Sequence, residues 1–325
     1  MPKFVIMPPQ TEHQRSWAAR IADTLPDFDV VLPANAEDAK REIVDAEAAF
    51  GNLPADALAG ATKLRWLQSP QAAPPPGYYH DELIAHPVTV TNFRGIYNDH
   101  ISAHIMMMVL ALSRGLPGYM RAKARHDYEK DANDAPFIFL PDSTAVIVGV
   151  GGIGGDTALH CKGFGMHVIA VDPRVGEPPA GVDELFPVGQ LSSVIGRGDF
   201  VLVTMPHTPE NKGLFNAEMF AHMKSTAYFV NIGRGPTTVL DDLAAAIENG
   251  VIAGAGLDVY ETEPLPAEHK LWDLDNVVLT PHVAAKEDEG GANLNQRRSD
   301  LLLDNARRFA AGEELLNVVD KSLWF

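Results

Sequence analysis

The sequence is poor in cysteine and in basic residues, and it has no long apolar run. With one cysteine, Cys161, among 325 residues, no disulfide can form within the chain. Lys and Arg total 26 against 43 Asp and Glu, and the net charge of −17 argues against nucleic acid or an anionic membrane surface as a partner. No apolar run approaches the roughly 20 residues that a membrane helix needs, and charged residues follow the start MPKFVIMPPQ too soon for a signal peptide. These absences favour a cytoplasmic protein that binds neither membranes nor nucleic acids.

A glycine-rich turn between two apolar runs is the most informative stretch, STAVIVGVGGIGGDTALHCKGFGMHVIAVD at residues 143–172. Residues 144–148 are apolar or β-branched, as in a strand buried on both faces of a parallel sheet. A helical stretch at 153–164 and a second apolar run at 166–171 follow the glycines. This order predicts a compact βαβ unit.

The glycines of this turn, Gly149, Gly151 and Gly154, have the spacing GxGxxG. In that fingerprint the first glycine permits a tight turn, the second leaves room for a pyrophosphate, and the third lets the helix pack close to the strand. The free N–H groups at the start of the helix favour the phosphates. Asp172, 18 positions after Gly154, has the spacing of an acid that binds the adenosine ribose. The stretch predicts nucleotide binding without the GK[ST] of a P-loop, and a methyltransferase pocket is the competing interpretation.

Two sets of short apolar runs predict two α/β domains in a chain whose 46% hydrophobic content suffices for a large core. The first set predicts a small parallel layer of about five strands, at residues 4–7, 28–32, 48–50, 65–68 and 88–91. The second predicts a doubly wound sheet of about six strands, made by the βαβ unit and residues 200–204, 227–232, 252–257 and 277–280. Residues 98–114 predict a buried helix leading into the second domain, and residues 292–310 predict a final amphipathic helix that returns to the first.

Two features resemble a metal site or a reactive thiol but have simpler interpretations. His100 and His104 stand four residues apart on the predicted helix, a spacing that could bind zinc, yet the HExxH glutamate and an evident third ligand are missing. Cys161 falls within the helix after the glycine turn, where packing is the expected role. We expect no metal centre.

Four polar side chains follow predicted strands of the second sheet, where parallel strands bring such positions to one crevice: Arg234, Asp258, Glu263 and His282. Three of them suit a reaction. Arg234 lies between glycines in NIGRG, where a guanidinium can grip a carboxylate and polarise a carbonyl. His282, in VVLTPHVA, can exchange a proton near neutral pH. Glu263, in LDVYETEP, could hydrogen-bond the far nitrogen of that imidazole and favour its charged form. Joined to a nicotinamide, these groups define the reduction of a 2-oxo acid, with His282 protonating the new oxygen and Arg234 holding the substrate.

Over nearly its whole length the chain resembles the D-isomer-specific 2-hydroxyacid dehydrogenases, and most of all their glyoxylate/hydroxypyruvate reductase branch. The matching stretches are VGVGGIG, VTMPHTPENKGLFNAEMFAHMKSTAYFVNIGRG, GAGLDVYETEPLP, VVLTPHVA and LLNVVD. The resemblance implies a Rossmann NAD(P)-binding domain at residues 98–285, inserted in a smaller, flavodoxin-like α/β substrate-binding domain at 1–97 and 286–325. It also implies a homodimer joined through the cofactor domains.

The resemblance further implies roles for individual residues. Arg234, Glu263 and His282 match the family's catalytic trio. Backbone at Ala72 and Ala73 would receive the substrate carboxylate, alongside Arg234 and His282. Contacts with the dinucleotide are implied for the glycine turn, for a set of strand-end residues and for Asp258, which would meet the nicotinamide carboxamide: Gly149, Gly151, Gly152, Ile153, Gly154, Asp172, Pro206, Ile232, Asp258 and His282.

The sequence leaves the substrate and the choice of dinucleotide open. The carboxylate loop reads QAAPPP where the family often has GAG, and Ala103 and Val239 stand where acids are usual. Asp172 favours NAD, because a carboxylate repels the 2′-phosphate of NADP, whereas Arg174 could offset the acid and admit NADP. The similar formate dehydrogenases carry glutamine where Glu263 stands. A nicotinamide-sensing binding protein on the same scaffold is the alternative to an enzyme, although all three catalytic groups are retained.

Overall fold

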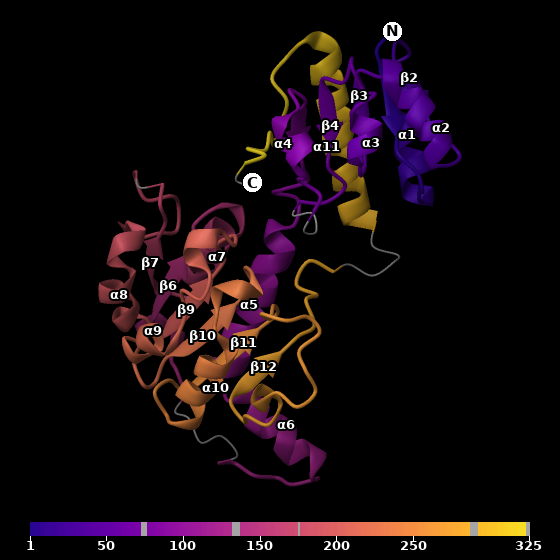
Figure 1. The fold of residues 1–325 in the computed structure, drawn as a ribbon. Coiled ribbons are helices and arrows are strands. Elements are labelled where there is room, and N and C mark those ends of the chain that lie inside the picture. Colours follow the sequence, from indigo (N-terminus) through magenta and orange to yellow (C-terminus); the bar gives the residue numbers. More distant parts are fainter. Residues whose placement is uncertain (73–76, 132–136, 175, 287–291, 323–325) are drawn as a thin grey trace. The chain divides into compact units, whose positions relative to one another are not determined.

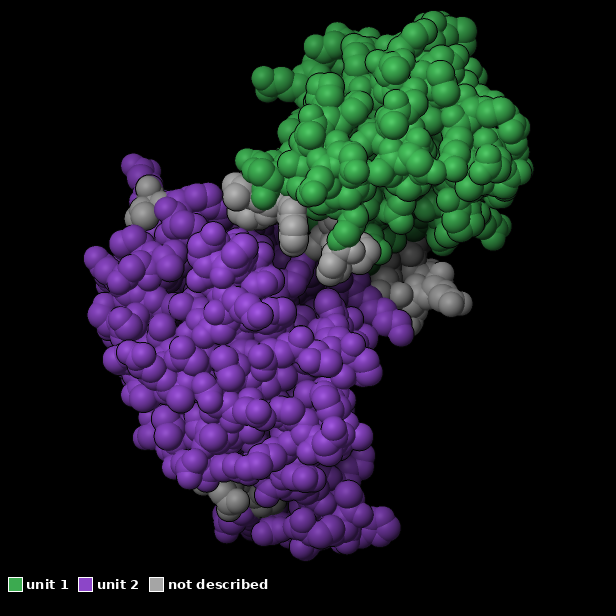
Figure 2. All heavy atoms as spheres, viewed as in Figure 1, with its two compact units in different colours: residues 1–96, 287–325 green, residues 97–286 purple. Residues whose placement is uncertain are grey.

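The structure is a computed structural model that describes residues 1–72, 77–131, 137–174, 176–286 and 292–322. The chain divides into two compact units (Figure 2). Unit 1 comprises Met1–Ile96 and Glu287–Phe325, and unit 2 comprises Tyr97–Lys286. Each unit contains one parallel sheet with helices around it (Figure 1), so the two-domain α/β class expected from the sequence is confirmed.

Unit 1 is built on a five-stranded parallel sheet. Its elements in chain order are β1 (Lys3–Ile6), α1 (Glu12–Thr24), β2 (Asp29–Val31), α2 (Ala36–Glu42), β3 (Ala48–Phe50), α3 (Ala55–Leu58), β4 (Trp66–Gln68), α4 (Asp81–Ala85), β5 (Thr89–Thr91) and α11 (Ala292–Ala311). The strand order is β2-β1-β3-β4-β5, and each predicted apolar run of the first set overlaps one of these strands. The final helix α11 packs on α1, where Trp17 donates a hydrogen bond to Asn295 at 2.9 Å.

Unit 2 is built on a seven-stranded parallel sheet. Its elements are α5 (Asn98–Ser113), α6 (Leu116–Ala124), β6 (Thr144–Val148), α7 (Gly152–Gly163), β7 (His167–Val171), β8 (Glu184–Phe186), α8 (Leu191–Val194), β9 (Phe200–Val203), α9 (Ala217–Ala221), β10 (Tyr228–Asn231), α10 (Leu240–Glu248), β11 (Gly254–Leu257) and β12 (Val277–Leu279). The strand order is β12-β11-β10-β9-β6-β7-β8. The chain adds β7 and β8 on one side of β6 and then continues with β9 on the other side, so the strand order reverses at β6. In doubly wound sheets of this kind, ligands bind at the carboxyl ends of the strands next to that reversal.

The seventh strand, β8, corrects the expectation of about six strands. Glu184–Phe186 pairs in parallel with β7 at the edge of the sheet, in register Ile169↔Glu184. All three of its residues are only partly buried, so no apolar run marks them in the sequence. An edge strand needs less apolar surface than a central one, and for that reason the pattern of apolar runs did not predict β8.

The helix α5 is a core helix of unit 2. Its buried residues include Ile105, Met108, Val109 and Leu112, and it packs on α7 and on the strands β10 and β11 (Figure 1). Among the described residues no single helix is long and apolar enough to cross a membrane, and α5 and α6 satisfy that test only as a pair bent by 72°. The burial of these residues of α5 explains why they are apolar.

Candidate active site

The turn between β6 and α7 requires glycine at two of the fingerprint positions. Gly149 has φ +94°, and a Cβ there would lie 2.8 Å from the backbone nitrogen of Met205. A Cβ on Gly154 would lie 2.1 Å from the carbonyl oxygen of Gly149, so the helix can approach the strand only because this residue lacks a side chain. At Gly151 a Cβ would meet no atom nearer than Arg174 Nη2 at 3.6 Å, which leaves open backbone at the start of α7.

The geometry of this turn fits a dinucleotide. Gly152 and Ile153 form the first turn of α7, whose N–H groups have no side-chain cap at Gly151. Uncapped N–H groups at a helix N-terminus attract phosphate oxygens. Asn98 of α5 also faces this helix start, because a Cβ on Gly152 would lie 2.5 Å from Asn98 Nδ2.

Asp172 directly follows β7 and has a buried side chain, and four N–H groups donate to its carboxylate. Oδ2 accepts from the backbone of Val150 at 2.8 Å, and Oδ1 accepts from the backbone of Arg174 at 2.9 Å. The guanidinium of Arg174 donates to both oxygens, at 3.0 and 3.2 Å. Burial acts to raise the pKa of the Asp172 carboxyl, but the hydrogen bonds from Arg174 and Val150 outweigh it and hold the pKa below its usual value. The side chain of Arg174 is 75% exposed, so it is free to turn toward a ligand.

The arginine loop after β10 is fixed by the buried side chain of Asn231. Its Oδ1 accepts from the backbone of Gly233 at 2.9 Å, and its Nδ2 donates to the carbonyl of Arg234 at 3.3 Å. A Cβ on Gly235 would lie 1.8 Å from the carbonyl oxygen of Tyr260, so this loop lies directly against the one that follows β11. Asn231 was not singled out from the sequence, where a strand-end Asn has no distinguishing pattern.

His282 and Glu263 form a hydrogen-bonded pair beside that loop. Nδ1 of His282 lies 2.7 Å from Oε2 of Glu263, whose other oxygen accepts from the backbone of Tyr260 at 3.1 Å. The imidazole is 53% exposed and the carboxylate 37% exposed, so both can reach a small molecule in solvent. Burial lowers the pKa of the Arg234 guanidinium, while the nearby charge of Glu263 acts to raise it. Arg234 stays protonated because its usual pKa is so high.

Ile232 and Pro206, also expected from the sequence, lie in neighbouring loops. The backbone of Ile232 donates to the carbonyl of Val203 at 3.2 Å, which continues the pairing of β10 with β9. A Cβ on Gly233 would lie 2.5 Å from the carbonyl oxygen of Met205, the residue before Pro206. These contacts place both residues at the carboxyl ends of adjacent strands in the middle of the sheet.

Asp258, at the end of β11, is a buried carboxylate that contacts two residues missed as site residues. Thr280 donates to its Oδ1 at 2.6 Å, and His104 Nε2 lies 2.9 Å from the Thr280 hydroxyl. The sequence placed His104 on a predicted helix four residues after His100, and only its spatial proximity to Asp258 distinguishes it. In the described part of the chain, no group of three His, Cys, Asp or Glu side chains could hold a metal ion.

The expected substrate loop belongs to unit 1. The carbonyl of Ala72 accepts a hydrogen bond of 2.9 Å from Asn92 Nδ2, and Ala73 lies outside the described residues. In unit 2, Cys161 is buried in α7, and burial raises the pKa of its thiol to about 12. A thiol that stays protonated is a packing residue rather than a nucleophile.

Comparison with known proteins identifies the family. The model of "D-isomer specific 2-hydroxyacid dehydrogenase, NAD binding domain" matches residues 106–284, more than half of the chain. The chain is 36% identical to an uncharacterized protein of Corynebacterium melassecola over 233 residues, which are 70% of this chain and 73% of that one. It is 31% identical to a glyoxylate reductase of Thermofilum pendens over 240 residues, which are 73% of this chain and 69% of that one.

A solved structure agrees with these sequence matches. The D-isomer specific 2-hydroxyacid dehydrogenase of Xanthobacter autotrophicus, solved with NADPH and MES, superposes with a TM-score of 0.82 at 26% identity, covering 100% of this chain and 99% of that one. The family acts on 2-hydroxy acids with a nicotinamide dinucleotide, so the protein is an oxidoreductase with an NAD-binding domain. The chain belongs to the D-isomer specific 2-hydroxyacid dehydrogenase family.

Proposed function

We propose that this protein reduces a small 2-oxo acid of the glyoxylate or hydroxypyruvate type, and oxidises the matching D-2-hydroxy acid in reverse. The observation that carries the proposal is the 2.7 Å contact between His282 Nδ1 and Glu263 Oε2, beside the loop that holds Arg234. A braced imidazole and a fixed guanidinium are the groups that reduction of a carbonyl next to a carboxylate requires. The name of the glyoxylate reductase relative supports the substrate class.

Each of the three side chains has a separate role in the reaction. A bound reduced nicotinamide supplies the hydride for carbon 2 of the oxo acid. Nε2 of His282 donates the proton to the substrate oxygen, because Nδ1 is engaged by Glu263. The carboxylate of Glu263 pairs with Nδ1 and fixes the ring. Arg234 grips the substrate carboxylate and polarises the carbonyl, and in the oxidative direction His282 accepts the hydroxyl proton.

We assign the binding of dinucleotide to unit 2 and part of the binding of substrate to unit 1. Gly149 and Gly154 shape the turn for the pyrophosphate. Asp258 is assigned to the nicotinamide carboxamide. In unit 1, the peptide N–H groups at Ala72 and Ala73 are assigned to the substrate carboxylate. The hydrogen bond from Asn92 to the carbonyl of Ala72 supports the assignment at Ala72, since it holds the backbone of that residue.

The dinucleotide is NAD(H) by preference, and NADP(H) is also accepted. The Asp172 carboxylate is positioned at the end of β7, where it can bind ribose hydroxyls and repel a 2′-phosphate. When the Arg174 guanidinium leaves Asp172, it favours NADP(H) instead, because this exposed group can pair with the 2′-phosphate.

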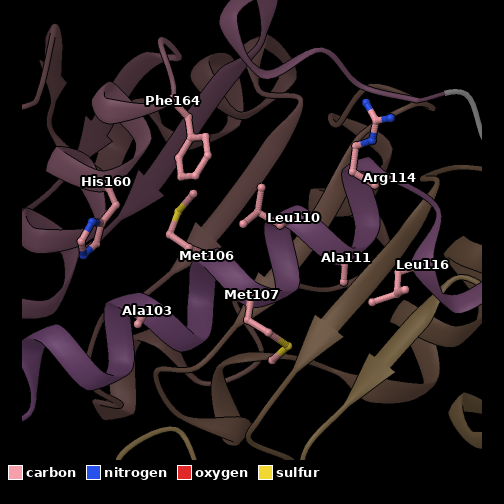
Figure 3. A pocket seen from close by; sticks show the side chains of 9 residues that line it. All are labelled: Ala103, Met106, Met107, Leu110, Ala111, Arg114, Leu116, His160 and Phe164. Carbon is pink, nitrogen blue, oxygen red and sulfur yellow. The ribbon is translucent and has the colours of Figure 1, made fainter.

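The protein is further proposed to form a homodimer through unit 2. An apolar hollow lies between α5 and the end of α7, lined by Met107, Leu110, Leu116 and Phe164, which are 37% to 47% exposed. Figure 3 shows Met106 and Leu110 of α5 close to Phe164. Contiguous exposed apolar residues of this kind favour a protein interface.

A turnover assay tests the proposed activity. Purified protein is mixed with NADH or NADPH and a panel of 2-oxo acids that includes glyoxylate and hydroxypyruvate, and the absorbance of the reduced cofactor is followed. We expect turnover with at least one acid. The His282→Ala variant should lose at least about a hundredfold in kcat while its Kd for NADH stays within about twofold, because the proton donor acts only in the chemical step. Tight NADH binding without turnover of any 2-oxo acid would instead indicate a nicotinamide-sensing binding protein.

A further inference from the structure

The backbone of His282 has an uncommon conformation that the surrounding turn maintains. Its φ is +54°, in the left-handed region that side chains other than glycine rarely adopt. The turn is held by the hydrogen bond from the His282 amide to the carbonyl of Thr280 at 3.0 Å and by Tyr260, whose hydroxyl donates to the same carbonyl at 2.9 Å. Such a conformation persists only where neighbouring groups secure it.

Asp258 secures the other side of this turn. Its Oδ1 accepts from the amide of Val283 at 2.9 Å, and its Oδ2 accepts from the amide of Ala284 at 2.9 Å. These are the two residues that follow His282 in the chain. The Asp258 side chain is 1% exposed, and both of its oxygens accept hydrogen bonds from the protein around it. Hydrogen bonds to a buried carboxylate are stronger than those between neutral groups.

The direction of the hydrogen bonds from α5 to Asp258 follows from the Thr280 hydroxyl. That hydroxyl lies 2.6 Å from Asp258 Oδ1 and 2.9 Å from His104 Nε2. A hydroxyl has one proton, and an ionised carboxylate can only accept. Thr280 therefore donates to Asp258, and His104 must donate to Thr280 through Nε2–H. His104 Nε2 also lies 3.7 Å from Asp258 Oδ1, and its side chain is 16% exposed.

We propose that His104 is a positioning residue for His282. By donating to Thr280, it orients the hydroxyl proton toward Asp258, and Asp258 in turn holds the amides that fix the backbone of His282. This role rests on the proposed function, in which His282 is the acid/base group. His104 lies on α5, far in sequence from the other members of this network. It therefore couples the position of that helix to the orientation of the His282 imidazole.

Variants of His104 separate its hydrogen bond from its packing. His104→Gln keeps an N–H donor at this position, whereas His104→Phe keeps the ring volume and removes the donor. Thr280→Val keeps the shape and removes the hydroxyl. Two measurements are made on each variant and on the double variant that combines His104→Phe with Thr280→Val: amide hydrogen exchange at Val283 and Ala284 by NMR, and kcat and KM for the 2-oxo acid.

We expect His104→Phe to speed exchange at both amides about tenfold and to lower kcat about tenfold, with KM changed less than about twofold. His104→Gln should have amide exchange rates and a kcat close to those of wild type. The double variant should be no worse than Thr280→Val alone, because both changes interrupt one chain of hydrogen bonds.

Equal behaviour of the Gln and Phe variants, whether both normal or both impaired, would overturn the positioning role. Should His104→Phe fail to fold, the comparison of His104→Gln and Thr280→Val with wild type still decides, since the proposal requires a normal Gln variant and an impaired Val variant. Absence of turnover in wild type would refute the proposed function, while the exchange measurement would still test the hydrogen-bonded chain.

Discussion

At the scale of single residues, the shape of the Arg234 guanidinium is as important as its charge. The loop fixes this residue through Asn231 and the close approach of Gly235 to Tyr260. A lysine ammonium at the same place would carry the charge but could not form two parallel hydrogen bonds. We expect Arg234→Lys to lower kcat/KM for the 2-oxo acid at least about a hundredfold, as measured by steady-state kinetics.

The exposed surface pair of Arg125 and Glu129 provides a control for this substitution. Arg125→Lys should leave kcat/KM within about twofold, because surface ion pairs contribute little. A nearly normal Arg234→Lys enzyme would mean that the arginine only neutralises charge.

Arg174 decides how well NADP(H) is used. Its guanidinium is 75% exposed and pairs with Asp172, so it can exchange that carboxylate for a 2′-phosphate. We expect Arg174→Ala to lower the ratio of kcat/KM for NADPH to that for NADH about tenfold or more, with the NADH value changed little. An unchanged ratio would show that Arg174 has no part in recognising the phosphate.

The sequence indicated the site residues whose chemistry is visible in their type and spacing. Arg234, Glu263 and His282 follow strands and carry reactive groups, and the structure brings Glu263 and His282 to 2.7 Å. Asn231 and Thr280 are ordinary polar residues in the sequence, and their importance depends on which atoms they meet in space. Partners that close a hydrogen-bond network across distant elements have no periodicity to reveal them.

At the scale of elements, central strands were predictable because burial on both faces demands continuous apolar residues. β9 and β10 are buried throughout and coincide with their predicted runs to within two residues. β8 is half-buried at the sheet edge and has Glu184 as its first residue. A side chain at such an edge can be ionic, and the strand is then stabilised by its ion pairs as well as by burial.

Glu184 makes the stability of this edge depend on pH. Its carboxylate accepts from Arg197 at 2.5 and 3.0 Å and lies 2.8 Å from His167 Nε2. The hydrogen bond with Arg197, followed by that with His167, lowers the pKa of Glu184 from 4.5 to about 2. Because the folded pKa is the lower one, this stabilisation is fully present above pH 4.5 and is lost as the pH falls toward about 2.

We therefore expect the free energy of unfolding of Glu184→Gln to fall less steeply than that of wild type between pH 4.5 and about 2. Urea unfolding at a series of pH values measures the difference. Glu268→Gln, a change at an exposed loop carboxylate, should follow the wild-type curve. Parallel curves for wild type and Glu184→Gln would show that the ion pairs with Arg197 and His167 do not hold in solution.

At the scale of the whole molecule, parallel topology explains how residues far apart in sequence form one site. The turn after β6, the loop after β10 and the loops after β11 and β12 all leave the same end of the seven-stranded sheet. The sequence predicted this convergence because consecutive strands of a doubly wound sheet point the same way. The sequence could not predict which outer surface remains apolar. A helix that packs on its own sheet with one side and on a partner with the other has the same composition as a core helix.

The apolar hollow on α5 and α7 gives the last prediction, at the level of assembly. Leu110 is 37% exposed there, and Leu110→Glu would bury an unpaired charge in the proposed dimer. Such a charge costs about 3 kcal/mol or more, which weakens the dimer at least about a hundredfold. We expect wild type to sediment as a dimer in analytical ultracentrifugation and Leu110→Glu as a monomer. Val44→Glu, which places the same charge on a 48% exposed residue of unit 1, should remain dimeric. A monomeric wild type, or a Leu110→Glu variant that dimerises as tightly, would exclude this surface as the interface.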